Sequence, residues 1–174
     1  MFLRSVLSIS LLMAAVPSAF VCGESDHRQP KGCVNDFANV IDVNTRDRLT
    51  ALCTELDQKT HAQIAVVTID TLGGDSIDEY ATSLFNRWGI GHKDDNRGIL
   101  ILLSLSDRKY RIEIGRGFEA LFPNDRVARI GAEMIPDLKK QKYSEAVLHS
   151  TGMIASVIAK ERGVKLTTVP ATPL

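Results

Sequence analysis

The 174-residue sequence has no excess of charge of either sign, because 21 lysines and arginines balance 21 aspartates and glutamates. A neutral chain lacks the basic field that favours nucleic acid or an acidic membrane surface. The sequence also has no apolar run long enough to cross the roughly 30 Å hydrocarbon core of a membrane. With 44% hydrophobic residues, one core is expected. We therefore expect a single domain that binds no nucleic acid and has no transmembrane helix after signal removal.

Cysteine is scarce, with three residues and no CxxC pair of the kind that binds zinc. Cys53 falls on the apolar face of a predicted helix, where a buried thiol is expected. Cys22 and Cys33 flank a polar segment and could form a disulfide across it in an oxidising compartment. The spacing also allows a Cys33–Cys53 bridge, so both pairings stay open.

Residues 1–19 have the pattern of a secretory signal peptide. An arginine precedes the short apolar stretch Val6–Val16, and the segment ends in the small residue Ala19. Residues 20–33 are then expected to form a linker, and the protein to be exported, periplasmic or secreted. Lipid anchoring at Cys22 is the less favoured alternative, because the residues before it are bulky where a lipoprotein signal has small ones.

Hydrophobic periodicity predicts four helices and three strands after an extended edge segment, residues 34–41. The helices are expected at residues 44–59, from Ser76 to Trp88, from Asn124 or Asp125 to a break at Pro136, and at 144–162. The strands are expected at 63–69, 98–105 and 109–114. Ser76 and Glu79 match a capping box at the start of the second helix.

This order of elements predicts an α/β fold, a three-layer α/β/α sandwich with helices on both faces of a small mixed sheet. The short connection at residues 106–108 makes the last two strands an antiparallel hairpin at one edge. The domain is expected to cover residues 34–163. Residues 164–174, rich in threonine and proline, are expected to be a flexible tail.

Residues 88–98 form a glycine-rich loop whose acidic centre is the strongest candidate for a binding site. The hairpin should bring this loop close to the next glycine turn, Gly115–Glu119. Calcium takes six to eight oxygen ligands, and such oxygens could converge here from Asp94, Asp95, Asn96, Glu119 and Asp125. The alternative is that these residues only form a turn, cap a helix or lie in solvent. An EF-hand is excluded, because its alternating ligand spacing is missing.

Several motifs, in order, resemble the TPM domain family over residues 34–162. They are Val34-Asn35-Asp36, Leu72-Gly73-Gly74, Trp88-Gly89-Ile90-Gly91, Asn96-Arg97-Gly98 and Glu113-Ile114-Gly115-Arg116-Gly117-Phe118-Glu119. The resemblance implies an exported or lumenal domain, and relatives are linked to photosystem repair, weak acid phosphatase activity or calcium binding. The family's acidic pocket would correspond to Asp36, Asp94, Asp95, Glu119 and Asp125.

Two functions follow as expectations. The first is an envelope interaction, assembly or repair module that binds a divalent cation, calcium with magnesium as the alternative, and contacts an envelope or membrane-associated protein. The second is slow metal-assisted phosphate monoester hydrolysis, with Asp95 or Glu119 as the base and Arg97 or Arg116 steadying the phosphate. His92 could move protons, although a lone loop histidine is more often solvated. His61 and His149 have no evident partners in the sequence.

Overall fold

The structure, a computed structural model, describes residues 28–168, so the expected signal peptide, Cys22 and the end of the tail lie outside the described residues. The helices and strands follow the expected order. They are β1 (Val34–Asp36), α1 (Val43–Thr60), β2 (Gln63–Ile69), α2 (Ile77–Trp88), β3 (Gly98–Ser104), β4 (Lys109–Ile114), the 3-10 turn η1 (Arg116–Phe118), α3 (Asn124–Lys139) and α4 (Tyr143–Arg162).

The four strands form one mixed sheet in the order β1-β2-β3-β4. β1, β2 and β3 are parallel, and α1 and α2 connect them, whereas β3 and β4 pair antiparallel as a hairpin. Gln63 at the start of β2 is opposite Gly98 at the start of β3. The chain leading into β3 and the chain leaving β4 therefore meet at the amino end of the parallel strands, as the hairpin prediction requires.

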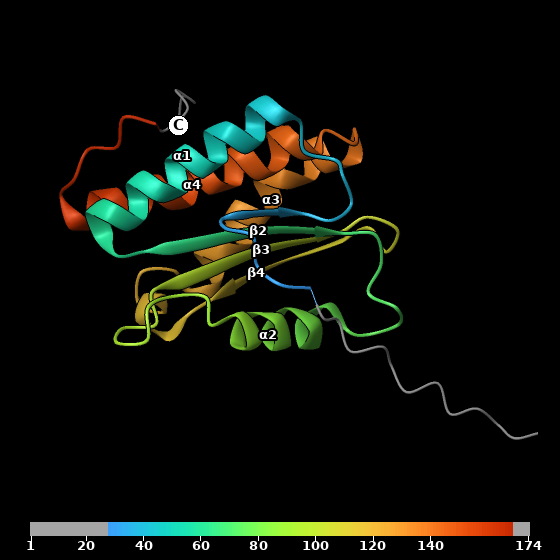
Figure 1. Ribbon diagram of the computed structural model, residues 1–174, viewed down its shortest axis with the longest axis horizontal. Helices are drawn as coiled ribbons and strands as arrows, with labels where there is room; N and C mark the ends of the chain where they lie inside the picture. The colour runs from blue at the N-terminus through green and yellow to red at the C-terminus, as the bar shows by residue number, and fades with distance from the viewer. Residues whose placement is uncertain (1–27, 169–174) are drawn as a thin grey trace, which may run out of the picture.

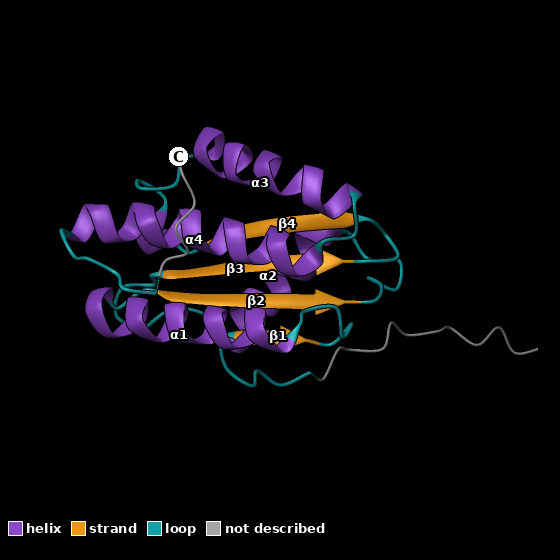
Figure 2. Ribbon diagram, turned by 90° about the horizontal axis from the view of Figure 1, so that it is seen from above, coloured by secondary structure: helices purple, strands orange, loops and turns teal. Residues whose placement is uncertain are grey.

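Helices cover both faces of the sheet, so the expected three-layer sandwich is confirmed (Figure 1). α1, α3 and α4 lie on one face and α2 on the other, and α3 lies towards the β4 edge (Figure 2). Alternate residues of β2 serve the two cores: Ile64 and Val66 pack in the larger one, Ala65 and Val67 in the one beneath α2. Coverage on both sides explains why β2 and β3 are almost continuously apolar.

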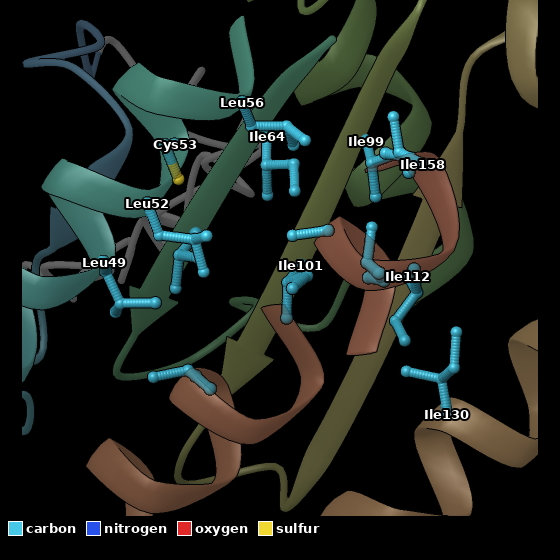
Figure 3. Packing of buried hydrophobic residues seen from close by; sticks show 14 of the residues in the cluster. Leu49, Leu52, Cys53, Leu56, Ile64, Ile99, Ile101, Ile112, Ile130 and Ile158 are labelled. Carbon is cyan, nitrogen blue, oxygen red and sulfur yellow. The ribbon is translucent and has the colours of Figure 1, made fainter. Parts of the chain in front are cut away.

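The larger core is built from aliphatic side chains. Leu49, Leu52 and Leu56 line the buried face of α1 and pack towards Ile64 and Ile101 of the sheet (Figure 3). All three leucines are fully buried, so each contributes about 1.5–3 kcal/mol of apolar burial to folding. No helix within residues 28–168 is long and apolar enough to span a membrane.

Two helix ends differ from the sequence prediction. Ser76 occupies the N-cap position of α2, but its side chain makes no capping hydrogen bond. α3 continues through Pro136 to Lys139. A proline in the last turn removes one backbone hydrogen bond, and the packing of Leu138 against the larger core offsets that loss.

The described part of the expected tail is attached to α1. Glu55 accepts hydrogen bonds from the backbone N–H groups of Thr167 and Thr168, at 2.8 and 2.9 Å. The Lys59 ammonium also contacts Glu55, at 2.7 Å, and donates to the carbonyl of Lys165. Lys59 and the threonine donors hold the pKa of Glu55 below its ordinary value. Residues 169–174 lie outside the described residues.

A disulfide joins Cys33, just before β1, to Cys53 on α1. Of the two pairings left open by the sequence, the structure therefore has Cys33–Cys53. Cys53 is buried as expected, with 5% exposure, but it is a disulfide partner and not a free thiol. The disulfide therefore links the residue that precedes β1 covalently to α1, which covers the sheet.

Removing this disulfide should destabilise the domain. The two cysteines are 20 residues apart in sequence, and closing a loop of that size in the unfolded chain stabilises the native state by about 3 kcal/mol. We expect the double variant C33A/C53A to lose about that much in urea unfolding. C22A is the matched control and should unfold like the parent, and a non-reduced peptide map that links Cys22 to Cys33 would contradict the pairing.

Candidate metal site

Two backbone turns meet at the amino end of the parallel strands. Gly115 donates its N–H to the carbonyl of Gly98 at 2.8 Å, and Gly117 donates to the carbonyl of Asn96 at 3.3 Å. A Cβ on Gly115 would lie 2.3 Å from the Asn96 carbonyl oxygen, and one on Gly117 would lie 2.1 Å from that of Asp95. Only glycine permits so close an approach. The loop before β3 and the turn after β4 therefore pack together, as the hairpin argument predicts.

Four of the predicted oxygen ligands lie on the surface of these two turns, and the fifth, Asp125, lies in the first turn of α3. Asp94, Asp95, Asn96, Glu119 and Asp125 are all exposed. Asp95 accepts a hydrogen bond from the backbone N–H of Arg97 at 3.1 Å, which stabilises the loop itself. Asp125 forms an ion pair with Arg129 one helical turn away, at 3.1 Å. Calcium binding by these carboxylates stays a prediction from the sequence.

Asp36 lies at the opposite end of the sheet from the acidic loop. It is opposite Thr68, five residues beyond Gln63 on β2, which is roughly 16 Å along a strand that rises about 3.3 Å per residue. The expectation that Asp36 shares a pocket with Asp95 is therefore wrong. Motif order in the sequence could not reveal this, because Asp36 ends β1 level with the last residues of β3, whereas Asp95 lies just before β3 begins.

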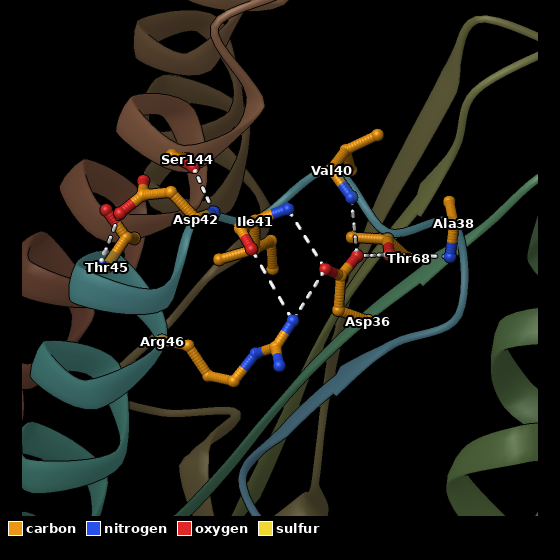
Figure 4. Close-up of polar contacts among 9 residues, drawn as sticks. All are labelled: Asp36, Ala38, Val40, Ile41, Asp42, Thr45, Arg46, Thr68 and Ser144. Carbon is orange, nitrogen blue, oxygen red and sulfur yellow. Dashed lines mark hydrogen bonds and ion pairs between the residues drawn. The ribbon is translucent and has the colours of Figure 1, made fainter.

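The Asp36 carboxylate instead fastens the turn between β1 and α1 (Figure 4). It accepts hydrogen bonds from the N–H groups of Val40 and Ile41, both at 3.0 Å, and from the Thr68 hydroxyl at 2.6 Å. The Arg46 guanidinium forms an ion pair with this carboxylate at 3.1 Å. The Asp36 side chain is 2% exposed. Burial alone would raise the pKa of Asp36, but these donors together lower it below 3.8.

Three side chains that could hold a metal ion come together beside the acidic loop. Asp57, His61 and His92 each offer one donor atom, and these atoms lie within 4.8 Å of one another. His92 Nε2 is 2.7 Å from Asp57 Oδ1, and the His61 and His92 rings are 5.6 Å apart in an edge-on arrangement. Within residues 28–168, no other group of three or more histidine, cysteine, aspartate or glutamate side chains brings its donor atoms this close together.

Local backbone structure places each donor. Asp57 is in the last turn of α1, and His61 caps that helix with a left-handed backbone, φ 53°. His92 follows Gly91, whose N–H donates to the side-chain oxygen of Gln63 at 2.9 Å. The side-chain nitrogen of Gln63 lies 3.4 Å from His92 Nε2. The start of β2 therefore holds the loop so that His92 faces the end of α1.

The charge of the site favours protonated His92 when no cation is present. The hydrogen bond to Asp57 raises the pKa of His92, burial opposes this, and the negative charges of Asp57, Asp95 and Asp94 raise it further. A metal ion would compete with that proton, because a histidine ligand must be neutral at its donor nitrogen. Two imidazole nitrogens and a carboxylate oxygen are a donor set typical of zinc and similar ions.

A cavity of about 560 Å³ begins next to the cluster. Its walls include Asp57 and the disulfide on one side, Gln63–Ala65 on the floor and Trp88–Ile90 on the other side. β1 pairs with β2 only from Val66 onwards, so the first half of β2 has no strand on that side. The cavity occupies this open edge of the sheet.

Arg97 was expected to bind a phosphate, but its side chain makes contacts within the domain. Its guanidinium stacks over the Phe118 ring at 4.4 Å and contacts the Glu161 carboxylate at 3.2 Å. The side chain is 11% exposed. Arg97 therefore fastens the loop to η1 and to the end of α4.

Sequence reasoning did not identify Asp57 and His61 as site residues and treated His92 as solvated. Asp57 and His61 are four residues apart, a spacing that places two side chains on one helical face. That signal was available but weak, because His61 lies just beyond the end of the helix and not within it. His92 is 31 residues further along, and only the packing of the loop against α1 brings it to the pair.

Comparison with known proteins decides the family. The family model of the TPM domain matches residues 34–157, most of the chain. The chain belongs to the TPM domain family. This confirms the resemblance seen in the motifs, and the match covers the sheet, both glycine turns and all three residues of the cluster. A search of curated proteins finds no match.

Solved structures share the fold of this TPM domain at low sequence identity. The N-terminal domain of a protein from P. gingivalis has a TM-score of 0.70 at 23% identity, covering 76% of this chain and 85% of that one. BA42 from Bizionia argentinensis has a TM-score of 0.61 at 12% identity, covering 74% and 92%. The N-terminal domain of cg2496 from Corynebacterium glutamicum has 0.57 at 11%, covering 94% and 93%. At these identities the likeness concerns the fold alone.

Replacing Asp36 should destabilise the domain in a pH-dependent way. A pKa lowered by folding gives stability that is present above the ordinary value of 3.8 and is lost as the pH falls through the lower folded-state value. We expect D36N to lose about 1–3 kcal/mol at neutral pH in urea unfolding. The difference from the parent should shrink below pH 3.8. D75N, in an exposed turn at the same end of the sheet, is the control.

Replacing Asp57 should lower the pKa of His92 towards 6.5, because its hydrogen bond is the largest cause of the increase. Because the pKa is raised, the His92–Asp57 pair stabilises the fold fully below pH 6.5. This stabilisation is lost as the pH rises through the folded-state pKa of His92. NMR titration of the His92 ring in metal-free D57N measures this. D47N, exposed on the same helix, should leave the titration unchanged, and an unshifted His92 in D57N would contradict the contact.

Proposed function

We propose that this TPM domain is an exported module that binds a divalent cation at the amino end of its parallel strands and contacts an envelope partner through the bound ion. The observation that carries the proposal is the convergence of Asp57, His61 and His92 within 4.8 Å. Three donors from two separate segments, α1 and the loop before β3, meet at one point. An ion bound there would join these two segments. A cation that binds only the folded state also stabilises the fold.

The donor atoms favour a borderline ion such as zinc at this cluster. Imidazole nitrogen is a good ligand for zinc, whereas calcium and magnesium prefer oxygen donors. The oxygen donors that the sequence assigned to calcium, on Asp94, Asp95 and Glu119, are exposed, and the charges of Asp94 and Asp95 act on His92. We therefore propose zinc or a similar ion for the cluster and retain calcium as the ion for the acidic loop.

Three protein ligands leave room for a further ligand on a four-coordinate ion. Asp57 is both a member of the cluster and part of the cavity wall, so an ion held by the cluster would lie close to the cavity. The backbone N–H of Val66 donates on that side, to the carbonyl of Cys33 just before β1, and the backbone groups of alternate residues in a strand point to the same side. The backbone of Ile64 is therefore directed towards the same space. A partner segment that supplies a ligand could therefore also pair with this open edge.

Phosphate ester hydrolysis has less support. Catalysis of that reaction needs positive groups on the phosphoryl oxygens, and among the described residues that line the cavity beside Asp57 there is no lysine or arginine. Arg97 is engaged by Phe118 and Glu161. We therefore propose cation-dependent binding as the function, with slow hydrolysis as the alternative.

Zinc titration of the purified, tag-free protein tests the cluster. We expect Zn²⁺ to raise the melting temperature, and calorimetry to show one site that weakens about 100-fold in H61G and in H92Q, since each loses one ligand. Glycine adopts the left-handed backbone of position 61 without strain, so H61G should preserve the C-terminal end of α1. H149Q, which removes a histidine of α4 outside the cluster, is the matched control.

The same titration separates the two sites. Ca²⁺ that raises the melting temperature of the parent and of H92Q, but not of D95N, would place calcium in the acidic loop. Zinc binding that survives in both H61G and H92Q would overturn the assignment to the cluster.

A further inference from the structure

A second cavity lies at the other end of the sheet, where β3 ends and β4 begins. Its volume is about 560 Å³, within the range of small-molecule binding sites. The hairpin residues 103–105 and 108–110 form one side, and the end of α3 with the chain leading into α4 forms the other. In open α/β sheets, ligands commonly bind at this carboxyl end of the parallel strands.

The rim of this cavity is positively charged. Arg108 and Lys109 come from the hairpin and Lys139 from the last turn of α3, and all three are exposed. The cavity lining in the described residues contains no aspartate or glutamate. The nearby Asp107 carboxylate is held by the Ser104 hydroxyl at 2.6 Å and the Leu72 N–H at 2.7 Å. In a chain with no net charge, this is a local concentration of positive charge.

The interior of the cavity is apolar and aromatic. Leu103 and Tyr110 of the hairpin face Leu138 and Ile135 of α3. A Cβ on Gly131 would lie 2.7 Å from the Tyr110 ring, so the absence of a side chain lets the ring lie directly against α3 and form a wall. Ile135 is 36% exposed, unusual for a large aliphatic residue in this structure. Apolar surface therefore remains open below a positive rim.

We propose that this cavity binds an amphipathic organic anion, with a carboxylate or phosphate head at Arg108, Lys109 and Lys139 and an aliphatic or aromatic tail against Ile135 and Tyr110. Charge complementarity selects the head, and apolar burial holds the tail. The site is separate from the metal cluster, which is at the amino end of β2 and β3. Its occupancy does not depend on a bound cation.

Octyl phosphate, kept below its micelle concentration, is the probe for this site. We expect calorimetry and NMR shifts around residues 103–110 and 135–143 to show binding at least about tenfold tighter than that of inorganic phosphate or octyl glucoside, because each of these has only half of the recognised chemistry. Comparable responses to all three compounds, or shifts that map elsewhere, would overturn the proposal.

Variants test the two halves of the cavity. K139Q should weaken octyl phosphate binding about tenfold, through the loss of one charged contact. I135Q should weaken it about threefold, through the loss of apolar contact at an exposed position outside both hydrophobic cores. K160Q, an exposed lysine of α4, should bind like the parent. Unchanged affinity in both K139Q and I135Q would overturn the site.

The anion could belong to a lipid headgroup or to a soluble metabolite, and vesicles distinguish these sources. Co-sedimentation with phosphatidylglycerol vesicles, absent with phosphatidylcholine and lost in K139Q, would assign the headgroup of an anionic lipid. Binding of octyl phosphate without vesicle binding would assign a soluble amphipathic anion.

Discussion

Direct backbone packing between the turn after β4 and the loop before β3 is the constraint on which the rest of this end of the molecule depends. Gly115 and Gly117 allow carbonyl oxygens of Asn96 and Asp95 to approach where a side chain would otherwise be. The contact fixes the loop relative to the sheet, and Gln63 and Arg97 fasten it further, to β2 and to α4. A loop held in this way presents His92 to the end of α1, so the candidate metal cluster depends on the packing of glycines that follow β4.

The two ends of the sheet have opposite chemical character. The amino end carries carboxylates and imidazoles, which suit a cation, and an open strand edge beside them. At the carboxyl end, Asp36 was expected to join the cation site, but its carboxylate binds the turn between β1 and α1. The hairpin and α3 form a positive rim at this end. The two proposed sites therefore lie at opposite ends of the sheet, and their lining residues suit ligands of opposite charge.

Much of the fold was predictable because its signals are local. Gln63–Ile69 is a continuous apolar run, and its strand begins and ends at the predicted residues. Gly163 ends α4 with a left-handed backbone, as its position in the sequence indicates. The predictions that failed concern competition between local signals and packing: α3 passes Pro136 because Leu138 packs against the core, and Ser76 does not use its capping side chain.

By itself the sequence determined the layers, the hairpin, the family and the meeting of the two glycine turns, because periodicity and turn chemistry act over a few residues. Only the tertiary structure decided that Cys33 pairs with Cys53 and that Asp36 is remote from Asp95. It also decided that the donor atoms of Asp57, His61 and His92 come together. Those relations join residues of separate segments, and the distance between two segments is set by how helices and loops pack on the sheet.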